Sequence, residues 1–193
     1  MFYIFGLGNP DDGYTNTRHN VGRDMVRSLV ESAAWKKDKH ANALVVIDNM
    51  KGEDVMWLLP ETFMNKSGDT VRYLLDKKAS RLTNFVVVYD DVDLPLGEVK
   101  VSIGRGDGGH NGIKSIIAAL KSKDFVRIRV GVARKSFWTG KARRPAGAAL
   151  ANHVLSVFSS SEQKKVAEVA GTIKNILEVI VSEGVDKAMN KFN

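Results

Sequence analysis

The 193-residue sequence contains no cysteine. Without a thiol, the chain can form neither a disulfide bond nor a thiolate metal site, and it has no cysteine nucleophile. Long apolar runs are also missing, since no uncharged stretch approaches the roughly 20 residues needed to cross a bilayer. The first ten residues, MFYIFGLGNP, lack the basic segment of a signal peptide. We therefore expect a soluble, cytoplasmic protein that does not enter a membrane.

Metal and nucleotide motifs are scarce as well. The four histidines are scattered and no H-E-x-x-H sequence occurs, so a histidine metal site is not expected. Residues 104–109, GRGDGG, match the G-x-G-x-x-G pattern of a dinucleotide-binding turn. This match falls past the middle of the chain, and the first strand–helix turn has Asp11 where the third glycine should be. We expect no metal and no cofactor, and keep a nucleotide-dependent enzyme as an alternative that measured dinucleotide binding would favour.

Positive charge is concentrated in one part of the chain. The formal net charge is +7. Between Lys121 and Gly147 there are nine basic residues and one acid, a net charge of +8, whereas the remaining 20 basic and 21 acidic residues carry −1. Such a concentration predicts a phosphate-rich partner. The alternative is a solvated basic loop that has no ligand.

Hydrophobic patterning indicates strands and helices that alternate along one domain, residues 1–193. Strands are predicted at 2–7, 43–48, 55–59, 85–89, 98–103 and 126–132, and helices at 21–30, 71–75, 111–121 and 161–182. The continuous apolar run FVVVY at 85–89 is typical of a central strand covered on both faces. Asn20 is expected to cap the first helix, and 133–153 to form a long basic loop. This pattern predicts an α/β fold with a sheet covered on both sides.

His19, in the stretch TRHNVG, stands at the predicted start of the first helix. If Asp90, which directly follows the FVVVY strand, accepts a hydrogen bond from one ring nitrogen, the other nitrogen is an acceptor that can take a proton from water. The adjacent helix N-terminus is expected to disfavour the imidazolium form. The alternatives are a surface histidine in a capped helix and an aspartate that caps a turn.

Asparagines occupy three other polar clusters, at Asn9, Asn65 and Asn111. An asparagine amide can donate to a carbonyl oxygen while it accepts from water or an amine. Several such amides around one point could hold a substrate carbonyl and stabilise charge that develops on its oxygen. Each of them alone is more often a turn or cap residue.

Four motifs in this order, GLGNP…Y…TRHN, TFMNKSG, DDVDLPLG and GGHNGIKSI, closely resemble the bacterial-type peptidyl-tRNA hydrolases. The resemblance extends from Phe2 to the C-terminal helix. It implies a single-domain, three-layer α/β/α sandwich around a mixed, mostly parallel twisted sheet, usually monomeric, with no cofactor and no obligate protein partner. It also implies hydrolysis of the ester between the peptide and the 3′-terminal ribose of peptidyl-tRNA, which recycles tRNA released prematurely by ribosomes.

The resemblance assigns roles to individual residues. The catalytic histidine and its aspartate partner fall on His19 and Asp90. Substrate-binding positions fall on Asn9, Tyr14, Phe63, Met64, Asn65, His110 and Asn111. For tRNA, the resemblance contributes Arg129, and the clustered charge adds Arg134, Lys141, Arg143 and Arg144; Arg105, three positions after Ser102, is a further candidate. Ser102 stands where relatives often carry a basic residue. A non-catalytic RNA-binding protein is the remaining alternative, and it predicts salt-sensitive tRNA binding without turnover.

Overall fold

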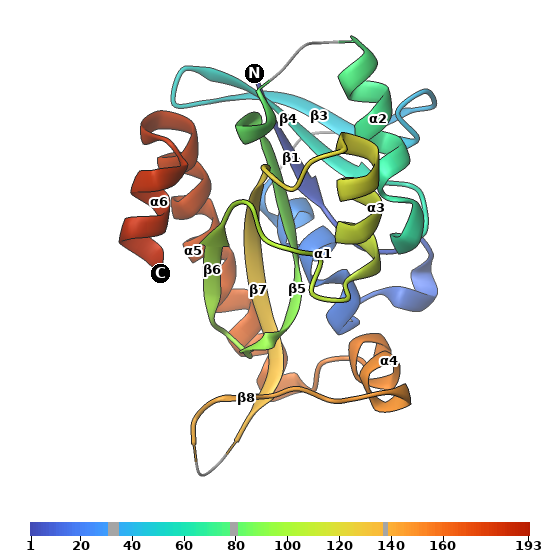
Figure 1. Cartoon of the computed structure of the whole chain (residues 1–193), viewed down its shortest axis with the longest axis vertical. Coiled ribbons are helices and arrows are strands. Elements are labelled where there is room, and N and C mark those ends of the chain that lie inside the picture. The colour runs from blue at the N-terminus through green and yellow to red at the C-terminus, as the bar shows by residue number, and fades with distance from the viewer. Residues whose placement is uncertain (31–34, 78–80, 137–138) are drawn as a thin grey trace.

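A mixed β-sheet runs through the computed structural model, which describes residues 1–30, 35–77, 81–136 and 139–193 (Figure 1). In the described part of the chain the sheet has eight strands. They are β1 (Phe2–Gly6), β2 (Lys36–Asp38), β3 (Ala43–Met50), β4 (Glu53–Pro60), β5 (Phe85–Pro95), β6 (Val99–Ser102), β7 (Val126–Lys135) and β8 (Ala142–Arg143).

The strand order is β2-β3-β4-β1-β5-β7-β6, and β8 pairs with β7 outside this path. The central strands β4, β1, β5 and β7 are parallel to one another, while β2–β3, β3–β4, β6–β7 and β7–β8 are antiparallel. β5 lies between β1 and β7, and its residues 85–90 are buried. The prediction of a central strand at 85–89 is therefore confirmed.

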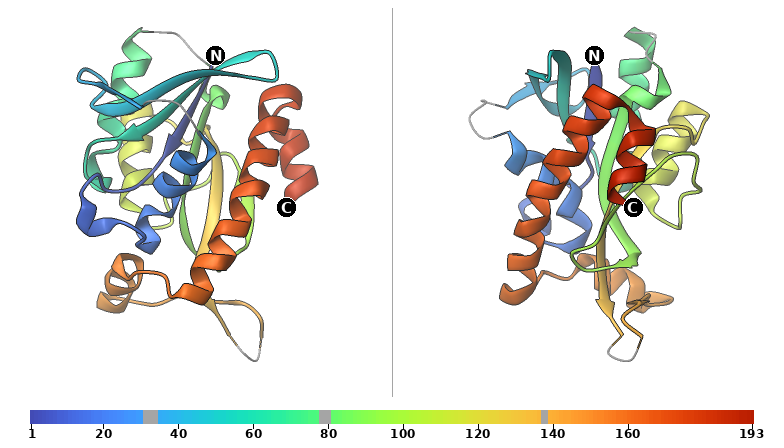
Figure 2. Two further views of the ribbon diagram at one scale, coloured as in Figure 1. Left: turned by 180° about the vertical axis from the view of Figure 1, so that it is seen from behind. Right: turned by 90° about the vertical axis from the view of Figure 1, so that its left-hand side faces the viewer.

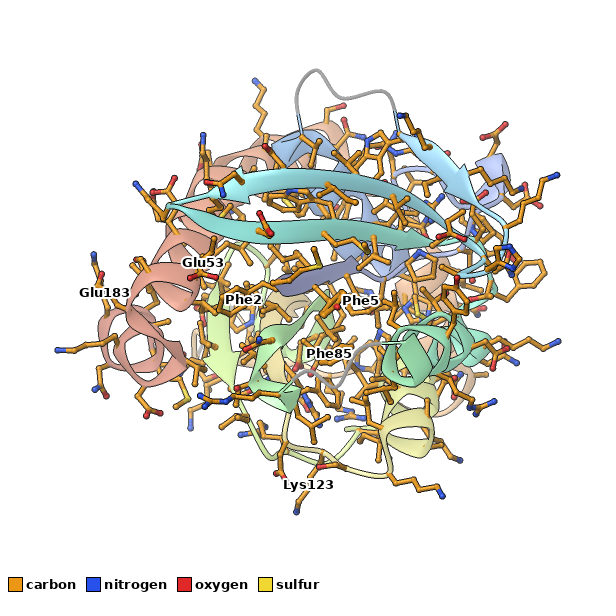
Figure 3. The ribbon with its side chains drawn as sticks, turned by 90° about the horizontal axis from the view of Figure 1, so that it is seen from above. Phe2, Phe5, Glu53, Phe85, Lys123 and Glu183 are labelled. Carbon is orange, nitrogen blue, oxygen red and sulfur yellow. The ribbon has the colours of Figure 1, made fainter. Side chains whose placement is uncertain are left out.

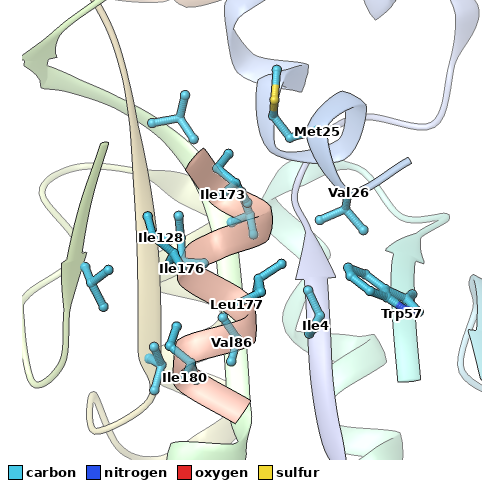
Figure 4. Close-up of a cluster of buried hydrophobic side chains, with 14 of the residues drawn as sticks. Ile4, Met25, Val26, Trp57, Val86, Ile128, Ile173, Ile176, Leu177 and Ile180 are labelled. Atoms are coloured by element: carbon cyan, nitrogen blue, oxygen red, sulfur yellow. The ribbon is translucent and has the colours of Figure 1, made fainter. Parts of the chain in front are cut away.

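Helices cover both faces of the sheet. Their bounds are α1 (Val21–Leu29), α2 (Gly68–Lys77), α3 (Asn111–Leu120), α4 (Ala148–Leu155), α5 (Ser160–Glu183) and α6 (Val185–Phe192). α1, α5 and α6 pack on one face, where Ile176 and Leu177 meet Ile4 and Val86 (Figure 4). α2 and α3 pack on the other, over the aromatic side chains of Phe5 and Phe85 (Figures 2 and 3). This is the three-layer α/β/α sandwich that the resemblance implies.

Within the described ranges, short 3₁₀ turns also connect these elements, namely η1 (Asp12–Tyr14), η2 (Arg18–Asn20), η3 (Met64–Lys66) and η4 (Leu82–Asn84). None of the helices in the described ranges is long and apolar enough to span a membrane.

The segment 133–153, expected to be a loop, contains regular structure. β7 continues to Lys135, β8 pairs back onto it, and α4 follows. The prediction missed these elements because β8 has only two residues and α4 is short and buries no residue, so neither packs a stripe into the core. β2 and α6 are likewise additional to the prediction.

Asn20 does occupy the N-cap position of α1, but its side chain makes no cap hydrogen bond. Instead, Oδ1 accepts from Asn9 N at 2.8 Å and Nδ2 donates to Asn9 O at 3.0 Å. The expectation of a side-chain cap is wrong. The side-chain amide of Asn20 instead makes two hydrogen bonds with the backbone N–H and C=O of Asn9, in the loop after β1.

Gly22 lets α1 approach β5 closely. A Cβ atom at this position would lie 2.2 Å from the carbonyl oxygen of Val88 and 3.0 Å from that of Leu7. Both contacts are to backbone, which cannot rotate away. Since η2 leads directly into α1, this close approach also brings His19 near Asp90, two residues after Val88 in β5.

We expect Gly22→Ala to lower the free energy of unfolding by about 1–3 kcal/mol, the usual cost of an added methyl in a packed site. Gly171→Ala is the matched control, because nothing lies within 4 Å of its Cβ position in the exposed side of α5. That change should stabilise the helix by roughly 0.5–1 kcal/mol. Urea unfolding of both variants checks this, and equal stabilities would contradict the packing argument.

Candidate active site

A cavity of about 900 Å³ opens at the carboxyl end of β1, beside β5. Gly6, the last residue of β1, pairs with Val88, so Asp90 lies just beyond the end of β1. Ligands of open α/β sheets bind at such strand ends. The nine residues predicted as catalytic or substrate-binding all line the cavity: Asn9, Tyr14, His19, Phe63, Met64, Asn65, Asp90, His110 and Asn111. They come from the segments after β1, β4 and β6 and from β5 itself, where Asp90 lies, and these are far apart in the sequence.

The hydrogen bond between His19 and Asp90, which the sequence left as one of several alternatives, is present in the structure. His19 Nδ1 lies 2.9 Å from Asp90 Oδ1 and 3.1 Å from Oδ2. Since an ionised carboxylate only accepts, Nδ1 carries the proton and Nε2 is left as an acceptor. Asp90 is 3% exposed, so this charge is almost fully removed from water.

Burial by itself lowers the pKa of His19, but the charge of Asp90 and the hydrogen bond to it outweigh burial and raise this pKa above its ordinary value of 6.5. The expectation that the helix N-terminus keeps His19 neutral is therefore wrong, because the carboxylate in direct contact is the stronger influence. Burial also raises the pKa of Asp90, yet His19 and His110 together hold it well below its usual range.

His110 is a second hydrogen-bond donor to Asp90. Its Nδ1 accepts from the backbone N–H groups of Gly112 (3.1 Å) and Ile113 (3.2 Å), so the imidazole caps α3. The proton must then be on Nε2, which lies 2.8 Å from Asp90 Oδ1. Two imidazole N–H groups thus meet one buried carboxylate. The sequence carries a signal for the cap, a histidine directly before a helix start, but none for the bond to Asp90.

His19, Asp90 and His110 are residue types that bind metal ions, and their donor atoms lie within 4.8 Å of one another. The tautomer of His110 disfavours such a site, since its Nε2 carries a proton and has no lone pair to offer a metal. The glycine run 104–109 likewise differs from a dinucleotide-binding turn. It follows β6, which is antiparallel to β7, and His110 occupies two N–H groups at the start of α3.

Asn9 lines the cavity, and its hydrogen bonds leave the side-chain Nδ2 group free to bind a ligand. Its backbone is paired with Asn20, and its Oδ1 accepts from Met64 N at 2.9 Å. Because Oδ1 is occupied, the amide offers a ligand its Nδ2 donor. Asn65 and Asn111 line the same cavity and are exposed.

An apolar wall faces these polar groups. Phe63 is 54% exposed at the cavity, whereas Met64 is 5% exposed and packs into the core beneath it. From the other side, α4 contributes Leu150, Ala151, Val154 and Leu155 to the lining. The sequence prediction missed α4 and therefore missed these residues. A cavity with one polar and one apolar side suits a ligand that has a reactive polar group and an apolar substituent.

Three of the predicted tRNA-binding residues line the cavity: Arg105, Arg129 and Arg144. Arg129 Nε donates to Asp91 Oδ2 at 2.6 Å, and Arg129 is 7% exposed. Arg144 Nη1 lies 2.8 Å from both carboxylate oxygens of Asp93. These two arginines therefore already have carboxylate partners. Arg134, Lys141 and Arg143 lie on the β7–β8 hairpin instead, away from the cavity lining.

Arg127 supports the loop before α3 from below. It is fully buried, stacks on Phe125 with its guanidinium carbon 4.4 Å from the ring centroid, and donates to the carbonyl oxygens of Arg105 and Gly106. Burial lowers the pKa of Arg127, but an arginine keeps its charge at neutral pH. A fixed cation beneath residues 105–106 holds the backbone that leads to His110.

Comparison with known proteins identifies the relatives of the chain. A family model described as peptidyl-tRNA hydrolase matches residues 3–193. The peptidyl-tRNA hydrolase of Clostridium tetani is 37% identical over 194 residues, covering 100% of this chain and 97% of the relative. That of Fervidobacterium nodosum is 40% identical over 190 residues, covering 98% and 94%. The crystal structure of the Acinetobacter baumannii peptidyl-tRNA hydrolase superposes with a TM-score of 0.88 at 29% identity, covering 100% and 94%.

The His19–Asp90 contact makes a prediction that needs no substrate. We expect NMR titration of the His19 ring to give a pKa above 6.5 in the wild type. In Asp90→Asn the opposing charge is lost while burial remains, so the His19 pKa should fall below 6.5. Asp93→Asn is the control, since Asp93 pairs with Arg144 and should leave the titration unchanged. A similar His19 pKa in all three proteins would show that Asp90 does not control it.

Proposed function

The chain belongs to the peptidyl-tRNA hydrolase family and is a hydrolase, and we propose that it cleaves the ester between the peptide and the 3′-terminal ribose of peptidyl-tRNA with water activated by His19. The observation that carries this mechanism is the His19–Asp90 hydrogen bond of 2.9 Å at the cavity, which leaves Nε2 of His19 as a proton acceptor. An enzyme acting on this substrate works in the cytoplasm, where tRNA and ribosomes are.

The proposed reaction has two proton transfers. His19 Nε2 takes a proton from water as the water oxygen bonds to the ester carbonyl carbon. The imidazolium that forms is stabilised by Asp90. When the tetrahedral intermediate collapses, the bond to the ribose 3′ oxygen breaks and the imidazolium returns its proton to that oxygen. The products are a tRNA with a free 3′ hydroxyl group and a peptide carboxylic acid, which ionises in water.

The substrate-binding residues divide by chemistry. The Nδ2 donor of Asn9 has a direction set by Met64 N and suits an oxygen that gains negative charge in the transition state. Asn65 and Asn111 are proposed to bind polar groups of the ester and the peptide backbone. The apolar wall of Phe63 and α4 is proposed to receive peptide side chains, and Tyr14 to line the entrance.

For tRNA, we propose electrostatic attraction to the basic residues near the cavity. Arg105 is exposed there. Arg129 and Arg144 have carboxylate partners and so contribute less net charge than the sequence suggested. The hydrolysis itself needs no contact with these residues. We therefore expect their substitution to affect affinity for tRNA more than the chemical step.

The decisive assay measures release of free tRNA from an N-blocked aminoacyl-tRNA, with the unblocked aminoacyl-tRNA as the substrate control. We expect turnover of the blocked ester. His19→Ala should reduce kcat by about 10²–10⁴-fold, the usual cost of losing a general base. His40→Ala is the matched variant, because His40 is exposed in the turn between β2 and β3 and stacks on Tyr73, outside the cavity.

Two results would contradict the proposal in different ways. A fully active His19→Ala variant would remove His19 as the base. Salt-sensitive tRNA binding with neither ester cleaved would favour the non-catalytic RNA-binding alternative.

The pKa of His19 also predicts the pH dependence. The base acts in its neutral form, so kcat/KM should fall as the pH drops through the His19 pKa, by about tenfold per pH unit below it. Because that pKa is raised above 6.5, the decline should already begin above pH 6.5. A pH–rate profile of the wild type checks this, and activity that stays constant down to pH 5.5 would exclude a histidine base with a raised pKa.

A further inference from the structure

Large apolar side chains are exposed at few places on the part of the chain that the structure describes. They are Ile47, Phe63, Leu155 and Val157, which are between 46% and 65% exposed. Phe63 and Leu155 line the cavity, whereas Ile47 lies in β3 outside its lining. Val157 is also outside the lining, and no step of the proposed reaction uses it. Exposed apolar residues that adjoin one another mark an interaction site, so the position of Val157 relative to the cavity matters.

Val157 is connected to two residues of the cavity rim. Leu155, the last residue of α4, precedes it by two positions, and the chain between them is extended at Ser156 (φ −76°, ψ 146°). Val157 also forms an isolated antiparallel bridge with Thr17. Thr17 in turn donates from its N–H (3.1 Å) and its hydroxyl group (2.7 Å) to the carbonyl oxygen of Tyr14. Since Tyr14 and Leu155 both line the cavity, Val157 lies next to the rim on this side.

The bridge leaves backbone groups of Val157 unused. Its two hydrogen bonds, of 3.1 and 3.3 Å, join residues 16 and 18 to residues 158 and 156. Thr17 and Val157 are therefore a pair without mutual hydrogen bonds, and their own N–H and C=O groups point away from each other. In the described part of the chain, no backbone hydrogen bond reaches Val157 from its other side. Extended peptides bind to such unpaired edges through their own backbone.

The two ends of α4 have different surroundings (Figures 1 and 2). The helix has eight residues and is therefore about 12 Å long. Its N-cap, Gly147, lines the cavity three residues after Arg144, which donates to the carbonyl oxygen of Gly108 in the loop of Arg105. The other end of α4 leads into the bridge to Thr17, beside η2. The cavity thus has arginines at one end of α4 and exposed apolar side chains at the other.

Acidic residues lie on the same side as the bridge. Asp11 and Asp12 are exposed, three and two residues before Tyr14. Among the residues that the structure describes, neither has a basic side chain within 4.0 Å. Phosphate groups would be repelled by these carboxylates at close range. This side of the cavity therefore suits the peptide of a substrate and not its nucleic acid.

We propose that Val157, together with Leu155, binds the part of the substrate's peptide that lies beyond the esterified residue, and selects for apolar side chains there. This inference rests on the proposed function, which places the ester at His19 and the first side chain at the apolar wall. From the wall the peptide leaves the cavity past Tyr14 in an extended conformation. Its next side chains cover Val157, and the unpaired backbone groups of that residue are available to its peptide groups.

The test compares blocked peptidyl-tRNAs that share one tRNA and one esterified alanine. They are acetyl-Ala-tRNA, which is too short to cover Val157, acetyl-Leu-Leu-Ala-tRNA and acetyl-Asn-Asn-Ala-tRNA. In the wild type, we expect kcat/KM for the leucine substrate to exceed that for the asparagine substrate by about fourfold or more, the effect of about one buried methylene group. Equal values for the two longer substrates would overturn the proposal.

Substitutions of exposed residues assign the preference to its site. Val157→Asn should bring the two longer substrates to similar kcat/KM values, mainly by raising KM for the leucine substrate. Val157→Leu should keep the preference, because it keeps an apolar side chain. Ile47→Asn is the matched control, since Ile47 is 65% exposed in β3 and outside the cavity lining, and it should keep the wild-type ratio. A wild-type ratio in Val157→Asn, or its loss in Ile47→Asn, would overturn the proposal.

The short substrate separates this inference from the proposed function. Acetyl-Ala-tRNA should be cleaved at the wild-type rate by all three variants, which also shows that they are folded. A wild type that cleaves every substrate without regard to the peptide would overturn the inference and leave the hydrolase proposal intact. A wild type that cleaves none of them would remove the proposed function, and the inference with it.

Binding of uncharged tRNA decides between peptide and nucleic acid at this site. Val157→Asn should bind uncharged tRNA as tightly as the wild type, because no phosphate is expected beside Asp11 and Asp12. Weaker tRNA binding by this variant, with an unchanged preference between the two longer substrates, would assign this side of the cavity to nucleic acid and overturn the proposal.

Discussion

The buried carboxylate of Asp90 is the charge around which the cavity is arranged. Removing a carboxylate from water costs several kcal/mol unless hydrogen bonds replace the lost hydration. Here the imidazole N–H groups of His19 and His110 supply that replacement. His19 belongs to η2, directly before α1, and His110 is the cap residue of α3. The starts of two helices on opposite faces of the sheet therefore meet at Asp90 of β5. The start of α3 also lies close to η3, since a Cβ at Gly112 would lie 2.6 Å from Met64 Sδ.

The segment that carries His19 is held from its other side by the C-terminal part of the chain. Arg18 is 2% exposed, its Nη2 lies 2.9 Å from both carboxylate oxygens of Glu162, and its guanidinium stacks 4.6 Å from the Phe158 ring centroid. Glu162 also closes the capping box of α5 with Ser159. Hydrogen bonds to Arg18 and Ser159 hold the pKa of Glu162 below its ordinary value, although burial opposes this. The cap of α5 and the segment that carries His19 thus share one carboxylate, that of Glu162.

Many of the cations that the sequence concentrates in one segment are neutralised by carboxylates or buried in the fold. The sequence concentrates cations between residues 121 and 147, yet the fold divides them into separate groups. Arg127 supports a loop from inside the core, and Arg129 and Arg144 meet Asp91 and Asp93 at the cavity rim. Among the described residues, Arg134, Lys141 and Arg143 of the β7–β8 hairpin have no carboxylate within 4.0 Å, and neither do Lys121 and Lys123 after α3. Two of the three arginines that line the cavity, Arg129 and Arg144, are therefore neutralised by carboxylates, while the third, Arg105, is exposed there.

The sequence by itself determined the α/β class, the central position of 85–89 and the segments that meet at the cavity, because apolar periodicity and polar strand ends are local patterns. The sequence singled out His19 and Asp90, but whether they touch was decided by the fold, because Asp90 lies within β5, which continues to Pro95, and not at the end of a strand. Only the tertiary structure decided the tautomer of His110, the orientation of Asn9, the α4 wall and the carboxylate partners of the arginines. Each of these depends on which atoms, distant in the chain, come within hydrogen-bonding distance, and no local pattern encodes that distance.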